Sequence, residues 1–222
     1  TGQSFDRLHC IVTRLAETRA LEPISPVFCS ESFYEIAGQA ESDYLARWQV
    51  WTAFLNGAAG YGYGAQGLWQ FLDPDDPKGE TGKITNHPPV PWREAIRFPG
   101  SVQVGHARAL LETIDWWQLV PRRDALRVDG KPNPLPTATD ITPPHAASIG
   151  DNLWVVYIPR GNEGREIALA IPEAEEYAVT WYDPKSGTLP EAVADFGTLG
   201  SNGEISPFVP EEDWVMILCR EF

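Results

Sequence analysis

The segment Pro26-Val27-Phe28-Cys29-Ser30-Glu31-Ser32-Phe33-Tyr34-Glu35 decides the fold of this chain. Its first half is a short apolar run after a proline, and this pattern predicts a buried strand over residues 26–30. Its second half is polar and aromatic, so the carboxylate of Glu31 stands directly at the end of the strand. In sheets of parallel strands, ligands bind at the carboxyl ends of the strands, which makes Glu31 the first candidate for a functional residue.

Two predicted helices flank this strand. Apolar residues recur at helical spacing from Phe5 to Leu15 and again from Leu45 to Leu55. The second helix is predicted to start at Ser42, a candidate N-cap, and to stop at Asn56-Gly57.

A glycine-rich stretch and a third helix follow. Residues 58–64 mix glycine with tyrosine, and glycine permits the close approach of neighbouring backbones. The third helix is predicted from Ser101, as its N-cap, to Trp117, with Pro121 ending it. The order helix, strand, helix, strand, helix favours parallel strands joined by crossover helices. Two strands alone cannot form a core, and the chain starts at Thr1 without a methionine, so we expect further strands from outside it.

The sequence pattern changes after Pro121. A proline-rich connector, residues 131–144, precedes short runs that are separated by turn signals such as Gly161-Asn162. The candidate strands are residues 146–149, 153–158, 166–171, 177–182, 191–196 and 214–219. This spacing indicates an antiparallel β-sandwich. We therefore predict two domains, an α/β domain over residues 1–121 and an all-β domain over residues 122–222.

Composition and charge argue against several classes of partner. The formal net charge of −14 repels the phosphates of nucleic acids and anionic lipid head groups. No apolar run approaches the roughly 20 residues of a membrane-spanning helix. The three cysteines and four histidines lack the spacing of a metal site, so no metal or other cofactor is predicted. Nine Trp, seven Tyr and nine Phe suit carbohydrate, whose rings stack on aromatic faces, although most single rings are expected in the core.

The segment over residues 26–35 resembles the strand-seven signature of apiosidase-like glycoside hydrolases, Pro-Val-Leu-Asp-Gly-Glu-Pro-x-Tyr-Glu. The two agree at Pro26, Val27, Glu31, Tyr34 and Glu35. Further matches follow in family order: Asn56-Gly57-Ala58-Ala59-Gly60, Tyr63-Gly64, Trp69-Gln70, Pro91-Trp92-Arg93-Glu94-Ala95 and Pro99-Gly100. Parts of residues 152–215 resemble the C-terminal β-domain of the family, a type that is named collagen-binding.

This resemblance implies that the chain holds the C-terminal portion of a (β/α)8 TIM barrel, strands six to eight, followed by a small antiparallel β-sandwich. Residues 1–4 would be the end of strand six and residues 27–30 would be strand seven, while residues 59–70 would contain strand eight. The other five strands would lie elsewhere. A complementary chain that carries the N-terminal barrel strands is therefore an expected partner.

The resemblance makes Glu31 the nucleophile of a retaining glycosidase. Such an enzyme needs a second carboxyl group about 5–5.5 Å away as acid and base, and the resemblance puts that group on strand four, outside this chain. Cys29-Ser30 replaces the Asp-Gly that usually precedes the nucleophile. Glu35 is the local alternative, which we rank lower because it should be leaving the catalytic face four residues beyond the strand. Without the motif, Glu31 could equally be a loop carboxylate paired with an arginine.

Five further residues are predicted to bind the sugar by resemblance. Tyr34 would hydrogen-bond the nucleophile or the sugar, and Tyr63 and Trp69 would form the floor of the central subsite. Gln66 and Gln3 stand where relatives often have histidine, which leaves the identity of the sugar open. For each of the three aromatic residues, a place in the core is the alternative.

Two classes of function remain. The first is a retaining, apiosidase-like glycoside hydrolase acting on a plant-type polysaccharide or oligosaccharide, since release of apiose is the activity of the family. The second is a non-catalytic subunit that binds carbohydrate or protein or is purely structural. The resemblance favours a secreted or periplasmic location. Neither nucleic acid nor a membrane is expected as a partner.

Overall fold

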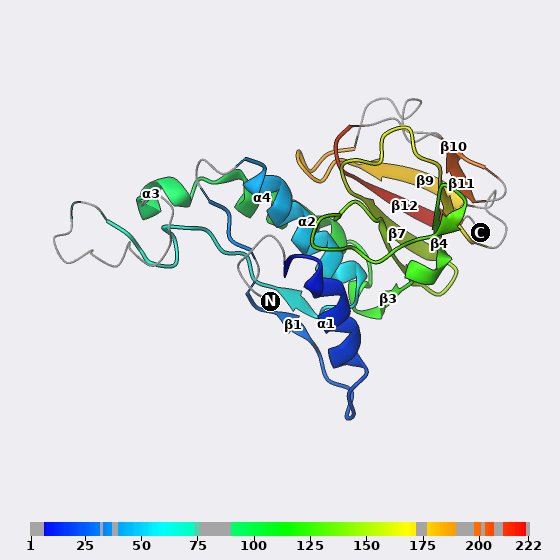
Figure 1. Cartoon of the computed structure of the whole chain (residues 1–222), viewed down its shortest axis with the longest axis horizontal. Coiled ribbons are helices and arrows are strands. Elements are labelled where there is room, and N and C mark those ends of the chain that lie inside the picture. Colours follow the sequence, from blue (N-terminus) through cyan, green and yellow to red (C-terminus); the bar gives the residue numbers. More distant parts are fainter. Residues whose placement is uncertain are drawn as a thin grey trace.

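The computed structural model has a mixed α/β region followed by an antiparallel β region (Figure 1). It describes residues 7–31, 33–36, 40–73, 75, 90–171, 177–189, 198–200, 203–206 and 211–220. Residues 1–4, expected to end a barrel strand, and the candidate strand at residues 191–196 lie outside the described residues.

The α/β region is built around two parallel strands. Its elements are α1 (Cys10–Arg19), β1 (Phe28–Cys29), α2 (Ser42–Leu55), β2 (Gly60–Tyr61), α3 (Trp92–Ala95), α4 (Pro99–Leu111) and the 3-10 helix η3 (Trp116–Gln118). Strands β1 and β2 are parallel, with Phe28 opposite Gly60 and Cys29 opposite Tyr61. A further parallel bridge joins Glu35 to Ala65. The predicted parallel pairing is therefore confirmed.

Glycine allows the two strands and the segments after them to approach closely. A Cβ atom added to Gly60 would lie 2.3 Å from the ring of Phe28. A Cβ atom added to Gly62 would lie 2.6 Å from the carbonyl oxygen of Ser30. The glycine-rich composition of residues 58–64 thus has a steric cause.

Two predicted helix boundaries were wrong. Helix α1 runs over Cys10–Arg19 and buries Ile11, Val12 and Leu15, so the predicted stripe is right but the helix lies further along the chain. Helix α4 begins at Pro99, whose fixed φ suits the first helical turn, and Ser101 lies inside the helix rather than at its N-cap. The last predicted turn is a separate 3-10 helix, η3.

Helix α2 covers the predicted residues and forms the centre of the molecule (Figure 1). Its N-cap is Glu41, so Ser42 is the first residue of the helix and not the predicted N-cap. All of its residues except Asp43 and Phe54 are buried, which is typical of a helix enclosed on every side. The ring of Trp51 stacks on Tyr157, with centroids 6.2 Å apart, and meets the edge of Tyr182 at 6.4 Å. Because both tyrosines belong to the antiparallel region, α2 joins the two regions into one hydrophobic core.

The antiparallel region contains two five-stranded sheets. The first sheet has the order β3-β6-β7-β12-β9, with β3 (Val120–Pro121), β6 (His145–Ile149), β7 (Leu153–Ile158), β12 (Trp214–Arg220) and β9 (Tyr177–Tyr182). The second has the order β10-β11-β8-β4-β5, with β10 (Thr198–Leu199), β11 (Glu204–Ser206), β8 (Ile167–Leu169), β4 (Leu126–Val128) and β5 (Lys131–Pro132), and the 3-10 helix η4 (Arg123–Ala125) precedes β4.

A second hydrophobic cluster lies between these sheets. It joins Leu126 and Ile167 of one sheet to Trp154, Trp181 and Met216 of the other. The first sheet is thus covered by α2 on one face and by the second sheet on the other. Five candidate strands are confirmed as β6, β7, β8, β9 and β12, whereas the short strands β3, β4, β5, β10 and β11 were not predicted.

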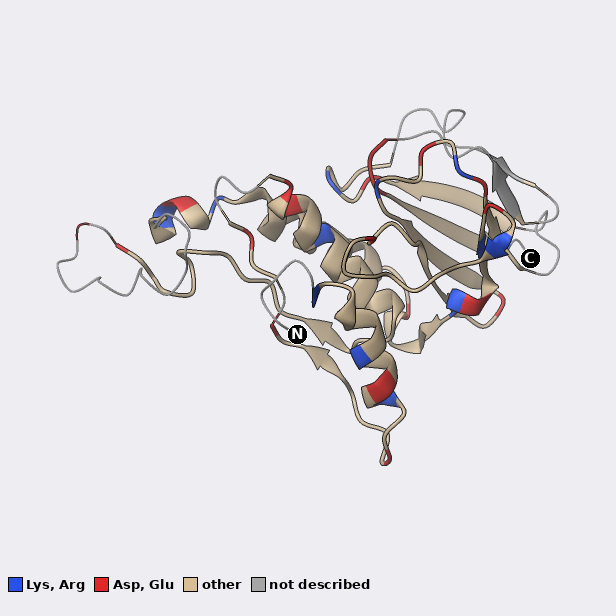
Figure 2. Ribbon diagram, in the orientation of Figure 1, with Lys and Arg blue, Asp and Glu red and all other residues tan. Residues whose placement is uncertain are grey.

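The predicted connector at residues 131–144 is partly wrong, because its first two residues form strand β5. Strand β3 pairs with β6 and ends at Pro121, where we placed the end of the α/β domain. The division of the chain into residues 1–121 and 122–222 stays a prediction. Figure 2 shows that charged residues lie mainly on the helices and connecting loops, and that β7 and β9 carry none.

Candidate active site

Glu31 lies two residues beyond β1, and its side chain is exposed. The hydroxyl of Tyr34 donates a hydrogen bond to Glu31 Oε1 over 3.4 Å. Burial, and then the negative charge of Glu31, raise the pKa of Tyr34 above its ordinary value, so this phenol remains a donor at neutral pH. A hollow of about 250 Å³ between α1 and β1 reaches from Ile11 to Glu31. The carboxylate is therefore accessible and has a fixed donor beside it.

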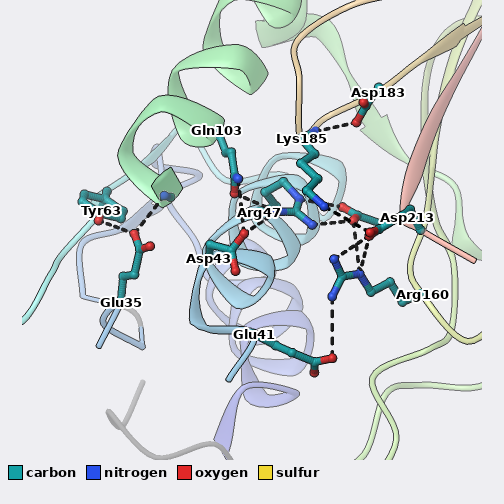
Figure 3. A network of polar contacts seen from close by, with 12 residues as sticks. Glu35, Glu41, Asp43, Arg47, Tyr63, Gln103, Arg160, Asp183, Lys185 and Asp213 are labelled. Atoms are coloured by element: carbon teal, nitrogen blue, oxygen red, sulfur yellow. Dashed lines mark hydrogen bonds and ion pairs between the residues drawn. The ribbon is translucent and has the colours of Figure 1, made fainter. Parts of the chain in front are cut away.

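Glu35 occupies a different environment, because its side chain is only 3% exposed. Its Oε2 accepts hydrogen bonds from the hydroxyl of Tyr63 at 2.6 Å and from the backbone N–H of Gly100 at 2.9 Å (Figure 3). Gly100 is in the first turn of α4, where free N–H groups and the helix dipole favour a carboxyl oxygen. The backbone of Glu35 is also fixed, since its N–H donates to Gly64 and its carbonyl accepts from Gln66.

Burial is the largest influence on the pKa of Glu35. It raises the pKa of this carboxyl above the ordinary value, and the negative charge of Asp43 acts in the same direction. The bonds from Tyr63 and Gly100 oppose this rise without reversing it. The same bond and the burial of Tyr63 raise the pKa of that phenol well above its usual range. Both groups are thus held in their protonated forms more strongly than in water.

The predicted sugar-binding residues are only partly brought together. Tyr34 lies against Gly64, where an added Cβ atom would stand 2.5 Å from the tyrosine ring. Tyr34 therefore joins Glu31 to the segment that carries Tyr63. Gln66 is 3% exposed, and its N–H donates to the carbonyl of Glu35.

The other two predicted residues are Trp69 and Gln3. The side chain of Trp69 is 50% exposed, so a place in the core is wrong for this residue. Gln3 lies outside the described residues. The described part of the predicted site is therefore centred on Glu31, Tyr34 and the stretch from Tyr63 to Gln66.

Sequence reasoning undervalued two residues of this arrangement, Glu35 and Gly100. We expected Glu35 to point away from the site, but the parallel bridge to Ala65 turns the chain back beside the segment after β2. Both residues lie inside stretches shared with the resembled family, and this was the available signal. Among the described residues, no group of three or more His, Cys, Asp or Glu is arranged to hold a metal ion. No helix in that part of the chain is long and apolar enough to span a membrane.

Two solved structures share the fold over nearly the whole chain. One, described as "Glycoside hydrolase", is 22% identical, has a TM-score of 0.68 and covers 98% of this chain and 46% of its own length. The other, a glycoside hydrolase family 5 protein from Bacteroides vulgatus ATCC 8482, is 21% identical, has a TM-score of 0.72 and covers 97% of this chain and 45% of its own. The chain thus spans less than half the length of these proteins, and its fold is that of part of a glycoside hydrolase barrel with a β region.

Family models identify both regions. The model described as "Apiosidase-like, catalytic domain" matches residues 6–118, which is more than half of the chain. The model described as "Putative collagen-binding domain of a collagenase" matches residues 141–219. A search of curated proteins found no match. The chain belongs to the apiosidase-like family.

Proposed function

We propose that this chain is part of a retaining glycoside hydrolase that cleaves a glycosidic bond in a plant-type polysaccharide, and that Glu31 is its nucleophile. The observation that carries the proposal is the position of Glu31. It is an exposed carboxylate at the carboxyl end of a parallel strand, within the part of the chain that matches the apiosidase-like catalytic domain. Enzymes with this type of barrel react at the carboxyl ends of their strands.

In this proposal β1 is barrel strand seven and β2 belongs to strand eight. The remaining strands and the acid/base residue come from a further part of the barrel, on this polypeptide or on a complementary one. The exposure of β1 and β2 supports the proposal that further barrel strands pack beside them. Among the described residues, β1 and β2 pair only with each other, and Phe28 is 59% exposed. Further strands on both edges would extend this two-stranded sheet.

An apolar hollow beside β2 supports the same proposal. It has a volume of about 410 Å³, and its lining includes Phe28, Phe54, Tyr61, Val104 and Trp116. Apolar side chains around a hollow of this size are expected to pack against further protein. We propose that the missing barrel strands and their helices fill it.

The proposed reaction has two steps. The carboxylate of Glu31 attacks the anomeric carbon and forms a glycosyl ester, while the acid residue protonates the departing oxygen. Water, deprotonated by that same residue, then cleaves the ester and restores Glu31. Tyr34 would orient the attacking carboxylate through its hydrogen bond to Oε1. Tyr63, Gln66, Trp69 and Gln3 would bind the sugar.

Glu35 is a poorer nucleophile in this scheme. Its carboxyl is buried, and Oε2 already accepts bonds from Tyr63 and Gly100. A raised pKa also reduces the fraction of the reactive anion. We propose that Glu35 holds Tyr63 and the start of α4 in place instead.

Hydrolysis of a panel of aryl glycosides by the enzyme with its complete barrel tests this function. Glu31→Gln is expected to lower kcat by several orders of magnitude, because a neutral amide cannot attack the anomeric carbon to form the glycosyl ester. Glu17→Gln is the matched control, since Glu17 lies on the outer face of α1 and is 64% exposed. Full activity in Glu31→Gln would refute the assignment. Retention of polysaccharide without turnover by the wild-type protein would support the non-catalytic binding role.

A further inference from the structure

The segment that carries Glu31 and Tyr34 is held by a side chain of α2. Gln49 is fully buried, and its Oε1 accepts a hydrogen bond from the backbone N–H of Phe33 over 2.6 Å. Its Nε2 donates to the carbonyl oxygen of Phe33 over 3.1 Å and to that of Leu45 over 2.9 Å. One amide side chain therefore satisfies both backbone groups of Phe33, which lies between the two site residues.

This contact replaces strand pairing where pairing is interrupted. Phe33 lies in neither β1 nor the bridge at Glu35, so it has no strand partner among the residues that the structure describes. A buried N–H or carbonyl without a partner is costly, and the amide of Gln49 offers an acceptor and a donor on two neighbouring atoms, so it can bond both backbone groups of one residue. Gln49 thus selects one conformation of the backbone beside Glu31.

The opposite side of α2 is anchored to the antiparallel region (Figure 3). Arg47, also fully buried, donates from Nε to Asp213 Oδ2 over 3.1 Å and from Nη2 to Asp213 Oδ1 over 2.8 Å. Its Nη1 donates to Asp43 over 3.2 Å and to Gln103 over 2.7 Å. Tyr157 of β7 donates to Asp213 over 3.0 Å. Asp213 directly precedes β12, so a two-pronged ion pair joins the start of this strand to the helix.

These two sets of contacts are continuous, because Arg47 and Gln49 are two residues apart on one helix. A helix transmits a displacement of one turn to the next, since its backbone is hydrogen-bonded throughout. A shift at Asp213 would therefore reach Phe33 through α2.

We infer that Gln49 is a positioning residue for the segment that carries Glu31, and that Asp213 holds Gln49 in register through Arg47. The antiparallel region is then part of the scaffold of the site, and not only a separate binding module. This inference rests on the proposed function for the meaning of the site, but the contacts themselves can be tested without any substrate.

Amide hydrogen exchange on the protein with its complete barrel, in the absence of substrate, tests the contacts. Gln49→Met, which keeps the volume and removes both hydrogen bonds, is expected to raise the exchange rate of the Phe33 amide by about 5- to 10-fold. Gln118→Met is the matched control, because Gln118, the last residue of η3, is exposed and its side chain donates to the exposed Asp115, the N-cap of that helix. An unchanged rate at Phe33 in a folded Gln49→Met protein would overturn the inference.

Asp213→Asn is a second variant, which keeps the shape of the side chain at position 213 but removes the negative charge that pairs with Arg47. It is expected to raise the exchange rate in α2 and, by a smaller factor, at Phe33. If Gln49→Met does not fold, Asp213→Asn is the variant that tests the inference. An exchange rate of the Phe33 amide equal to that of the wild type would then overturn it.

Kinetics of the enzyme with its complete barrel separate positioning from general stability. Gln49→Met is expected to lower kcat by up to about 100-fold, because a displacement of about 1 Å at a reacting group can have that effect, while KM changes less. If the wild type hydrolyses no glycoside but exchange at Phe33 increases as expected, the proposed function fails and the positioning contact stands. If the wild type is active and Gln49→Met changes neither kcat nor exchange, the inference fails and the function stands.

Discussion

At the scale of single residues, the protonation of Glu35 should make the stability of the protein depend on pH. Its pKa is raised by burial above the ordinary value of 4.5, so the folded protein keeps a proton that the unfolded chain has lost. The folded state therefore binds more protons, and this contribution to the free energy of unfolding falls as pH rises from about 4.5 through the raised pKa. Above that range the contribution is constant.

Urea unfolding of the wild type and of Glu35→Gln over a series of pH values measures this effect. The difference in unfolding free energy, wild type minus variant, is expected to decrease with rising pH in that window, because other titrating groups largely cancel. A difference that is constant or that increases with pH would show that burial does not control Glu35.

A second prediction at the scale of single residues concerns the packing around Gly100. A Cβ atom at Gly100 would lie 2.3 Å from Glu35 Oε2 and 3.1 Å from the Cβ of Ala46. Gly100→Ala is therefore expected to destabilise the protein by about 1–3 kcal/mol, as overpacking does. Gly105→Ala in the same helix is the control, since nothing lies within 4 Å of the added atom, and it should stabilise the protein by about 0.5–1 kcal/mol. Thermal and urea unfolding compare the two, and equal effects would contradict the packing argument.

The sequence located Glu31 at the end of a strand because the change from apolar to polar residues is local. The same local pattern could not show that Glu35 is buried, because the parallel bridge to Ala65 depends on a segment thirty residues further along the chain. Gln49 and Arg47 were missed for a related reason. Gln49 bonds the segment after β1, whereas Arg47 bonds Asp213 of the antiparallel region, and neither partner is close to the helix in sequence.

At the scale of elements, the buried ion pair between Arg47 of α2 and Asp213 should contribute more to the free energy of unfolding than a surface ion pair does. Arg47→Met leaves the buried carboxylate of Asp213 without its main partner, and the expected loss of unfolding free energy is about 3–5 kcal/mol. Arg108→Met removes a pair with Glu112 on α4 whose arginine is 77% exposed, and the expected loss is under about 1 kcal/mol.

The double variant Arg47→Met/Asp213→Leu checks the cause of that loss. Replacing both charges by apolar side chains removes the unpaired carboxylate, so much of the stability should return. Urea unfolding of the single and double variants forms the measurement. If the double variant loses as much unfolding free energy as the two single variants lose together, the two side chains do not act as a pair.

Long elements could be predicted from the sequence and short ones could not. The bounds of α2 were right because fourteen residues without Gly or Pro end at Asn56-Gly57. Strands β3, β5 and β10 have two residues each, which is too short for any alternation to be visible. Such strands are defined by their neighbours across the sheet, and this information is absent from the local sequence.

At the scale of the whole molecule, the two regions should unfold together. Besides the core around α2, Trp48 donates to the carbonyl of Ile141 over 2.9 Å, and Tyr182 donates to that of His106 over 3.0 Å. We predict one calorimetric transition whose measured enthalpy equals the van 't Hoff enthalpy. Two resolved transitions, or different midpoints by fluorescence and far-ultraviolet circular dichroism, would contradict this coupling.

The central claim is that Glu31 is the nucleophile of a retaining glycosidase, and trapping the glycosyl ester tests it most directly. The enzyme with its complete barrel is incubated with activated 2-deoxy-2-fluoro glycosides, which slow hydrolysis of the ester, and its peptides are then analysed by mass spectrometry. The account predicts one sugar per active site, attached to Glu31, and no label in Glu31→Gln. A sugar attached to Glu35 or to any other residue would contradict the account.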